Sequence, residues 1–327
     1  MIPYGASTDR MSVVIGLDIG GTKLAGGVLA ADARLLARRE RPTRAAEGVD
    51  VSLGEVYGLL SELAAAAAEH GALAGIGICA PGPLNPETGF IFNPTNMPGW
   101  VNIPLAEEVS RRFGVPCRVE NDANGAGLGE AVYGAGRGFR SVFYATISTG
   151  IGAGIILDGR VYHGKNGAAG EGGHVSIDYR SPVVCNCGSI GCIEALASGS
   201  AIARRARELA CERPETKMLS IAGDASRITA EIVARAAAQG DPLAAHLIEE
   251  TAEMLGAWLG SVVSLLDPDI IVIGGGVSKI GEPLFRKMRE TMPRRTINPF
   301  ASQTPIVSAQ LQSDAGILGA AAVILSR

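Results

Sequence analysis

A pattern of apolar strand, glycine-rich turn and apolar strand occurs twice in this chain, and it constrains the fold more than any other feature. The first copy is SVVIGLDIGGTKLAGGVLAA at residues 12–31, and the second is SVFYATISTGIGAGIILDGRVY at residues 141–162. Apolar runs that fold back through glycine are typical of β-hairpins. Gly20 and Gly150 take the same place in the two copies. We interpret the copies as the openings of two domains; the alternative is two unrelated hairpins.

Helical and strand patterns alternate through the rest of the 327 residues. Helices are expected near residues 51–70, 105–113, 123–133, 193–209, 230–239, 242–266, 283–291 and 317–325. Further strands are expected near residues 35–40, 73–80, 115–120, 270–273 and 305–308. This alternation predicts a smaller N-terminal α/β domain at 12–121 and a larger one at 122–311, with a C-terminal helix at 312–327 that returns to the first. Residues 1–11 are expected to be a loose tail, and residues 84–100 a loop.

The charge balance of the chain is close to neutral, with a net charge of −4 and an isoelectric point near 5.7. No basic surface is therefore expected to attract nucleic acid or an anionic membrane. The longest apolar stretches stop short of the ~18 residues of a membrane span, and no N-terminal segment resembles a signal peptide. Cys79, Cys117 and Cys211 are scattered along the chain. That usage is typical of a reducing compartment, so a cytoplasmic location is expected.

One short segment, residues 171–194, gathers metal-ligating side chains. It has a C-x-C-x4-C pattern with a histidine upstream, formed by His174, Cys185, Cys187 and Cys192. Four such ligands can close a tetrahedral shell around zinc, and Gly188 and Gly191 give the freedom that a tight knuckle needs. The alternative, buried or disulfide-bonded cysteines, would leave one of the three unpaired. A full shell predicts a structural metal, which would hold His174, Glu171 and Glu194 in place.

The first hairpin turn carries the residue types of a phosphate site. Gly20 and Gly21 allow the backbone to approach an anion, Thr22 adds a hydroxyl donor, and Lys23 adds positive charge. Asp18, at the end of the strand, could hold Mg²⁺ directly or through water. The alternative is an ordinary tight turn.

Two further strand ends carry candidate ligand-binding groups. Asp122, in the sequence NDAN, lies where a strand ends and a helix begins, which is where open α/β sheets bind ligands. Its carboxylate could accept a proton from a substrate hydroxyl; the alternative role is a helix N-cap. The glycines at 274–276 would let the backbone approach a flat ligand such as adenine or ribose, or could form a turn without a ligand.

Taken in order, these motifs resemble the ROK family of repressors, open reading frames and sugar kinases. The resemblance covers about residues 12–325 and rests on DIGGTK (18–23), NDAN (121–124), STGIG (148–152), EGGH (171–174), CNCGSIGCIE (185–194) and GGGVS (274–278). It implies a two-domain actin-like ATPase, or ribonuclease-H-like, fold. The sugar would lie in a cleft between the domains, with ATP and Mg²⁺ across it.

The resemblance also implies roles for individual residues. Asp122 matches the catalytic base. The sugar-contacting positions are Gly82, Asn96, Asn121, Asp122, Glu171, His174 and Glu194. The zinc ligands are His174, Cys185, Cys187 and Cys192. The contacts with phosphate, Mg²⁺ and adenosine are Asp18, Gly20, Gly21, Thr22, Lys23, Thr149, Gly150, Gly275, Gly276 and Val277. His174 could serve twice, binding zinc through one ring nitrogen and the sugar through the other.

The implied activity is ATP-dependent phosphorylation of the 6-hydroxyl of a hexose. Glucose is the favoured acceptor, because NPTNMPGW at residues 93–100 resembles the glucokinases of the family. N-acetylglucosamine, N-acetylmannosamine and fructose are alternative acceptors, and polyphosphate is an alternative donor. A homodimer or homotetramer is implied. A sugar-responsive repressor is disfavoured, because only about eleven residues precede the first strand, too few for a helix-turn-helix module. A sugar-binding protein without activity would be expected to lack Asp122 or Asp18.

Overall fold

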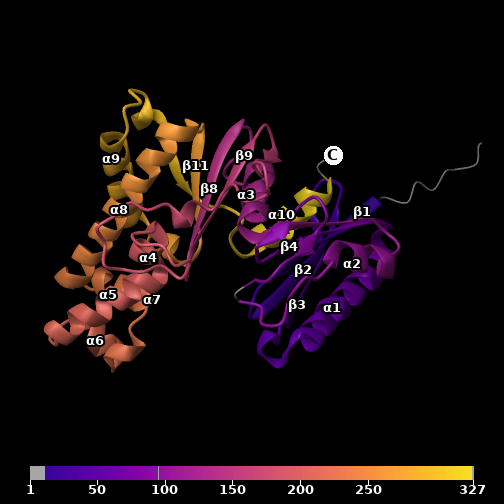
Figure 1. The fold of residues 1–327 in the computed structure, drawn as a ribbon, viewed down its shortest axis with the longest axis horizontal. Helices are drawn as coiled ribbons and strands as arrows, with labels where there is room; N and C mark the ends of the chain where they lie inside the picture. Colours follow the sequence, from indigo (N-terminus) through magenta and orange to yellow (C-terminus); the bar gives the residue numbers. More distant parts are fainter. Residues whose placement is uncertain (1–11, 95, 326–327) are drawn as a thin grey trace, which may run out of the picture. The chain divides into compact units, whose positions relative to one another are not determined.

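The computed structural model describes residues 12–94 and 96–325 (Figure 1), and the predicted loose tail lies outside the described residues. The chain forms two compact units. Unit 1 comprises residues up to 133, the short segment 163–168 and the residues from 313 onward. Unit 2 comprises residues 134–162 and 169–312.

Unit 1 is built on a five-stranded sheet in the order β3-β2-β1-β4-β7. Its strands are β1 (Ser12–Ile19), β2 (Lys23–Ala30), β3 (Leu35–Pro42), β4 (Ala72–Ala80) and β7 (Cys117–Asn121). The first three strands pair antiparallel, and β1, β4 and β7 pair parallel. The segment predicted as a loop contains a small ribbon of β5 (Leu84–Asn85) and β6 (Phe90–Ile91).

Helices cover both faces of this sheet. They are α1 (Val49–His70), α2 (Leu105–Phe113), α3 (Asp122–Tyr133) and α10 (Ala315–Leu325). Figure 1 shows α1 lying along the sheet of β1, β2 and β3. By length and composition alone α1 could cross a membrane, which the sequence prediction overlooked. Its buried side chains recur at helical spacing and join the unit 1 core, namely Val56, Leu59, Leu60, Leu63 and Ala67. Each large one contributes about 1.5–3 kcal/mol by leaving water.

Glycines allow α10 to lie very close to the opposite face of the sheet. A methyl group on Gly16 of β1 would come within 2.2 Å of the carbonyl oxygen of Ile317, and one on Gly77 of β4 within 1.8 Å of that of Ala320. Gly319 of α10 approaches α3 in the same way, with a methyl position 2.0 Å from the Gly125 carbonyl oxygen. The predicted boundary after residue 121 therefore needs correction, because α3 packs on α10 and the chain leaves unit 1 only after residue 133.

Unit 2 repeats the sheet of unit 1 strand for strand. Its order is β10-β9-β8-β11-β12, with the same sequence of antiparallel and parallel pairings. The strands are β8 (Ser141–Ile147), β9 (Ile151–Leu157), β10 (Arg160–Val161), β11 (Ile270–Gly274) and β12 (Ile306–Ser308). The two hairpin copies are thus equivalent elements, and the alternative of unrelated hairpins is wrong.

The helices of unit 2 enclose a separate core. They are α4 (Ile193–Ala197), α5 (Gly199–Glu212), α6 (Lys217–Ala222), α7 (Ala230–Ala238), α8 (Pro242–Leu266) and α9 (Glu282–Thr291). Trp258 of α8 meets Phe143 of β8 edge to face, with ring centroids 5.6 Å apart. One predicted helix at 193–209 is in fact two, because Ser198 interrupts it and caps α5 by accepting a hydrogen bond from the Ala201 N–H. Helix α6 was not predicted.

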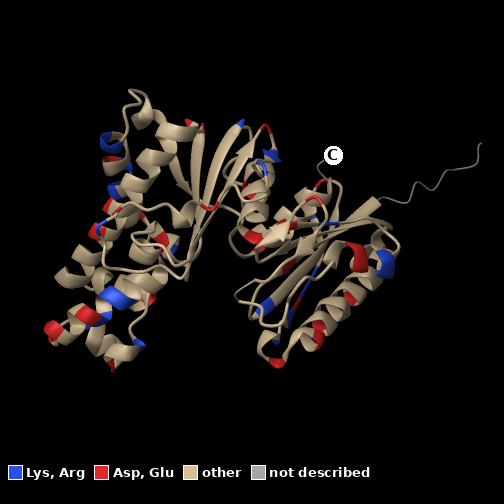
Figure 2. Cartoon of the chain, viewed as in Figure 1, with Lys and Arg blue, Asp and Glu red and all other residues tan. Residues whose placement is uncertain are grey.

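Figure 2 shows lysines and arginines interspersed with acidic residues along the helices of each unit. Several face an acid one helical turn away, as Arg204 faces Glu208 and Arg286 faces Glu290. Exposed pairs of this kind contribute about 0–1 kcal/mol each, so they keep the surface charge mixed more than they hold the fold together.

Candidate active site and metal centre

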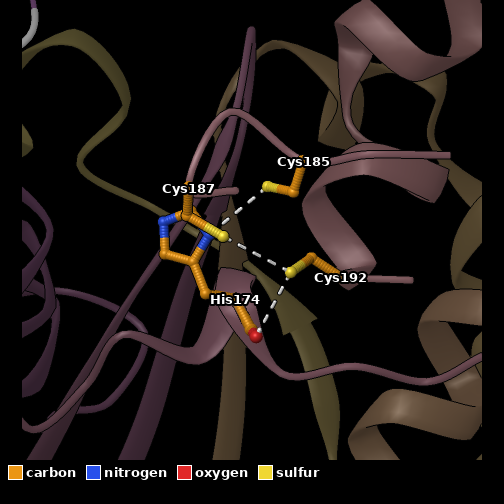
Figure 3. A group of neighbouring side chains, drawn as sticks. All are labelled: His174, Cys185, Cys187 and Cys192. Carbon is orange, nitrogen blue, oxygen red and sulfur yellow. Dashed lines mark hydrogen bonds between the residues drawn. The ribbon is translucent and has the colours of Figure 1, made fainter. Parts of the chain in front are cut away.

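The four predicted zinc ligands converge in unit 2, with their ligand atoms all within 4.8 Å of one another (Figure 3). They are His174, Cys185, Cys187 and Cys192. His174 Nδ1 lies 3.6 Å from Cys185 Sγ, and Cys187 Sγ lies 3.7 Å from Cys192 Sγ. A tetrahedral zinc ion with bonds of about 2.0 Å to nitrogen and 2.3 Å to sulfur spaces its ligand atoms roughly 3.5–3.8 Å apart. The donor set therefore fits zinc in both chemistry and spacing.

The backbone of the knuckle explains its glycines. Gly188 and Gly191 have φ angles of +87° and +69°, which side chains rarely permit. A methyl group on Gly191 would also lie only 1.9 Å from the Asp178 carbonyl oxygen. The N–H of Cys185 donates to the Ser189 carbonyl across the turn at 2.7 Å. The sequence thus shapes the loop before a metal binds.

The thiols of the cluster differ in their readiness to ionise. Burial raises the pKa of Cys185 to about 12 and also raises that of Cys192. A backbone hydrogen bond from Ser189 lowers the pKa of Cys187. Because zinc binds thiolates, metal binding must release protons from the two buried thiols, and the affinity for zinc must fall as the pH falls.

His174 presents its two ring nitrogens to different neighbours. Nδ1 faces the cysteine cluster, and Nε2 lies 4.0 Å from the Glu171 carboxylate. The His174 side chain as a whole is about one-third exposed. The ring can therefore bind a metal through Nδ1 and still offer Nε2 to another partner.

Glu194 connects the metal cluster with the second glycine turn. Its Oε2 accepts a hydrogen bond from the Ile151 N–H at 2.8 Å, and its Oε1 lies 3.8 Å from Cys185 Sγ. A methyl group on Gly150 would come within 2.5 Å of Oε2, so glycine is needed for the carboxylate to reach the turn. The sequence separation of 43 residues gave no hint of this contact.

Two glycine turns of unit 2 lie beside each other. They are the turns that were predicted to contact the nucleotide, at Thr149 and Gly150 and at residues 275–277. Gly275 has a φ of +84°, and a methyl group there would lie 2.3 Å from the Ile147 carbonyl oxygen at the end of β8. Among the described residues other than its chain neighbours, no atom lies within 4 Å of a methyl position on Gly276, which leaves room for a ligand. The first residues of α5 complete the group, because the Ser200 N–H donates to the exposed Thr149 carbonyl. Val277 is buried beside them.

In unit 1, Asn121 takes the N-cap position of helix α3, and Asp122 Oδ1 also accepts a hydrogen bond from the Ala123 N–H at 2.8 Å. The side-chain oxygen of Asn121 accepts hydrogen bonds from the N–H groups of Ala123 and Asn124, at 3.0 and 3.2 Å. Asp122 is the first helical residue, and it is exposed. The neighbouring Asn121 amide thus accepts from two N–H groups of the first turn, while the exposed Asp122 accepts from one of them. Gly82 lies close by, with a methyl position 3.3 Å from the Asn121 amide nitrogen.

Asp18, at the end of β1, shares this corner of unit 1. Burial and, to a smaller extent, the negative charge of Asp122 raise the pKa of Asp18 to about 6, against the opposing effect of Lys23. Two carboxylates that disfavour each other's charge in this way form a site suited to a cation.

The first glycine turn is fixed from both sides. Buried Thr43 donates its hydroxyl to the Gly20 carbonyl at 2.5 Å, and its N–H donates to the Thr22 carbonyl at 3.0 Å. Asn96 crosses over the turn, with its carbonyl oxygen 3.0 Å from a methyl position on Gly21. Thr22 is exposed.

The Lys23 side chain, which was predicted to add positive charge at the turn, is paired with an acidic side chain. Its ammonium group lies 2.9 Å from the Glu40 carboxylate on β3, and both side chains are exposed. Part of the positive charge expected at the turn is thus directed to Glu40, and the Gly20 N–H donates to the Lys23 carbonyl within the turn at 2.9 Å.

The sequence analysis missed a buried network beside Asp122. Glu120 accepts hydrogen bonds from the Asn121 N–H and the Asn124 amide, at 2.9 and 3.1 Å, through one oxygen. Its other oxygen lies 2.6 Å from His163 Nε2. Glu120, directly before NDAN at a strand end, could have been noticed, whereas nothing in the sequence near His163 points to the pairing.

Comparison with known proteins gives matches over nearly the whole chain. The ROK family profile matches residues 14–327. A glucokinase from Thermotoga maritima is 34% identical over 314 residues, which cover 96% of this chain and 98% of the relative. An N-acetylmannosamine kinase from Salmonella heidelberg is 32% identical over 307 residues, covering 94% and 96%. The solved structure of a ROK family glucokinase from Streptomyces griseus, in complex with glucose and AMPPNP, is 35% identical, with a TM-score of 0.80 and coverage of 94% and 98%.

These matches include both units and every motif described above. The similarity in structure confirms the predicted actin-like, ribonuclease-H-like fold class. The agreement of profile, relatives and fold leads to one assignment: the chain belongs to the ROK family.

Proposed function

We propose that this protein is an ATP-dependent glucokinase, which transfers the γ-phosphoryl group of ATP to the 6-hydroxyl of glucose. The proposal is supported by relatives named glucokinase that match nearly the whole chain and by a solved relative that holds glucose and AMPPNP. AMPPNP stands for ATP in that structure, with an NH group in place of the oxygen that bridges the β- and γ-phosphates.

The observation that carries the proposal is the cap of α3. Asn121 caps the helix, and Asp122 at its first residue is exposed, with one carboxylate oxygen accepting a hydrogen bond from the Ala123 N–H. In the proposed reaction Asp122 orients the 6-hydroxyl and takes its proton as the new O–P bond forms. Phosphoryl transfer needs alignment and charge neutralisation more than covalent help, so one carboxylate is enough for this step.

We assign the sugar contacts to two sets of residues, one from each unit. Unit 1 supplies Gly82, Asn96, Asn121 and Asp122, and unit 2 supplies Glu171, His174 and Glu194. Amides and carboxylates suit the recognition of hydroxyl groups by hydrogen bonds. His174 Nε2, which points away from the cysteine cluster, is the nitrogen available for the sugar.

We assign the nucleotide contacts to the glycine turns. Gly20, Gly21, Thr22 and Lys23 in unit 1, and Thr149 and Gly150 in unit 2, would contact phosphates, and Gly275, Gly276 and Val277 the adenosine. Asp18 would hold Mg²⁺, which enters with ATP and offsets the charge of the phosphates. Zinc at His174 and the three cysteines would be structural, because the protein ligands fill its shell.

We further propose a cytoplasmic homodimer or homotetramer without nucleic-acid or membrane partners. Three exposed apolar side chains of unit 2, Leu265, Ile297 and Phe300, offer a surface for a second copy. A hydrogen bond between the Ser264 and Thr296 hydroxyls and one from the Asn298 side-chain amide to Asp267 hold the two segments together. Light scattering on the purified protein would give the oligomeric state.

The test is ADP release by the purified protein with Mg-ATP, measured separately on glucose, N-acetylglucosamine, N-acetylmannosamine, mannose and fructose. Strong turnover on glucose with little on the acetamido sugars is the expected result. A preference for an acetamido sugar would move the substrate to the kinases represented by the Salmonella relative. Sugar binding without turnover, with ATP or polyphosphate, would contradict the proposal and favour a sugar-responsive regulator.

A further inference from the structure

The buried hydrogen-bond network beside Asp122 connects residues on both sides of it in the sequence. Glu120 is almost fully buried at the end of β7, with a side chain 5% exposed. Through one oxygen it holds the N–H of Asn121 and the side-chain amide of Asn124. These two residues stand on either side of Asp122 in the first turn of α3. A single carboxylate oxygen therefore fixes both flanks of the proposed base.

The other oxygen of Glu120 faces His163, which comes from an unusual part of the chain. The segment 163–168 belongs to unit 1, although the residues before and after it belong to unit 2. His163 Nε2 lies 2.6 Å from Glu120 Oε2. The hydrogen bond to Glu120 raises the pKa of His163, burial opposes this, and Glu87 adds to the rise. The protonated, paired form is thus favoured.

Other acidic side chains lie near Glu120, so a positive charge on His163 is stabilising at this end of the sheet. The charges of Asp18, Glu120 and Asp122 all raise the pKa of the buried Cys79 thiol on β4, after burial itself. Three carboxylates consequently lie close to one another at this end of the sheet. A cation at His163 offsets part of their repulsion.

From this geometry we infer that His163 and Glu120 form a positioning pair, which fixes the turn of Asn121 and Asn124 and thereby the orientation of Asp122. The inference rests on the proposed function, in which Asp122 is the base. Asn124 depends on Glu120 in particular, because within the described residues its side-chain oxygen is buried without a hydrogen-bond partner. Loss of His163 would leave a buried carboxylate oxygen of Glu120 without its donor, and the Glu120 side chain would no longer be held in one orientation.

If Asp122 is positioned less firmly, we expect kcat to fall more than the affinity for glucose and ATP. A misplacement of about 1 Å can cost on the order of a hundredfold in rate. For His163→Ala we expect kcat to fall roughly tenfold to a hundredfold, with KM for glucose and ATP changed by less than about threefold. His163→Gln keeps a hydrogen-bond donor and should recover most of the activity.

The pair also predicts a pH dependence. As the pH rises through the raised pKa of His163, the ion pair becomes a neutral hydrogen bond, and kcat should decline on the alkaline side. His163→Gln cannot titrate and should lack this decline. His246→Ala is the matched control, because His246 also faces a glutamate, Glu250, but lies exposed on α8.

The experiment compares the wild-type protein and these three variants by steady-state kinetics from pH 6 to 9. Amide hydrogen exchange at residues 121–124 is measured on the same samples. A wild-type kcat in His163→Ala, equal losses in His163→Ala and His163→Gln, or the same alkaline decline in wild type and His163→Gln would overturn the inference. If the wild type turns over no sugar, the proposed function fails, and exchange then decides: unchanged protection of residues 121–124 in His163→Ala would overturn the pairing as well.

Discussion

Gly316, the second residue of α10, lies directly against the carboxylate of Asp18. A methyl group on Gly316 would come within 2.3 Å of Asp18 Oδ2 and 2.8 Å of its Cβ. The last helix of the chain therefore limits where the acid at the end of the first strand can point. Only glycine leaves Asp18 its present position.

Replacing this glycine should impair activity. Gly316→Ala would push the Asp18 carboxylate aside, and we expect kcat with Mg-ATP to fall at least tenfold. The control is Gly54→Ala in α1, where a methyl group meets no atom within 4 Å. That change should leave kcat unaltered and stabilise the helix by about 0.5–1 kcal/mol. Equal kinetics in the two variants would show that the position of Asp18 is unimportant.

The raised pKa of Asp18 makes the ligand-free protein less stable at neutral pH. The folded protein keeps this proton to about pH 6, whereas the unfolded chain releases it near 3.8. The folded state binds more protons between these values, so the contribution of Asp18 to stability falls as the pH rises through this window and stays low above it. Asp18→Asn removes the charge and should raise the free energy of unfolding at pH 7 by on the order of 2 kcal/mol.

Urea unfolding at pH 4 and pH 7 measures this difference. The gain from Asp18→Asn should be small at pH 4 and full at pH 7, while phosphoryl transfer is lost. A gain that is the same at both values would mean that Asp18 does not carry the shifted proton.

Replacement of Asp122 should reduce catalysis and leave glucose binding nearly unchanged. Asp122→Asn keeps a polar side chain of the same size at the start of α3 but removes the proton acceptor. We expect the dissociation constant for glucose to change by less than about threefold and kcat to fall by 10²–10⁴. Calorimetry and steady-state kinetics on one preparation give both numbers. Near-normal turnover would remove Asp122 from the role of base.

Zinc removal should destabilise unit 2. We expect one zinc per chain by elemental analysis, released by chelator and by acid because Cys185 and Cys192 must lose protons to bind it. The thermal midpoint should then fall by about 10 °C. Cys187→Ser should mimic the loss, and Cys211→Ser, an exposed cysteine outside the cluster, should not. Metal-free protein with an unchanged midpoint would contradict a structural role.

The sequence predicted the parts of the fold that depend on local pattern. The hairpins, and helices such as α2 and α8, follow from periodic apolar residues, and the metal cluster from spacing within one segment. The break at Ser198 was missed, because a serine inside a helical pattern is a cap only if the backbone turns there. The boundary after 121 was wrong, because the contact of α3 with α10 joins residues about 190 positions apart through glycines.

Parts of the site could not be predicted either, because they depend on the folded backbone and on contacts between residues far apart in the sequence. In NDAN both Asn121 and Asp122 are good caps, and no rule of sequence says which one serves. The pairing of Glu120 with His163, and that of Glu194 with Ile151, each span 43 residues and depend on the folded sheets.

The position of α10 has a consequence for how the protein is made. This helix, residues 315–325, covers β1 and β4, which end by residue 80. A nascent chain on the ribosome therefore carries the sheet with its glycine face at Gly16 and Gly77 uncovered until residues 315–325 have been synthesised. Every residue of unit 2 has emerged before α10 is synthesised. During synthesis unit 1 is therefore begun before unit 2 but completed after it.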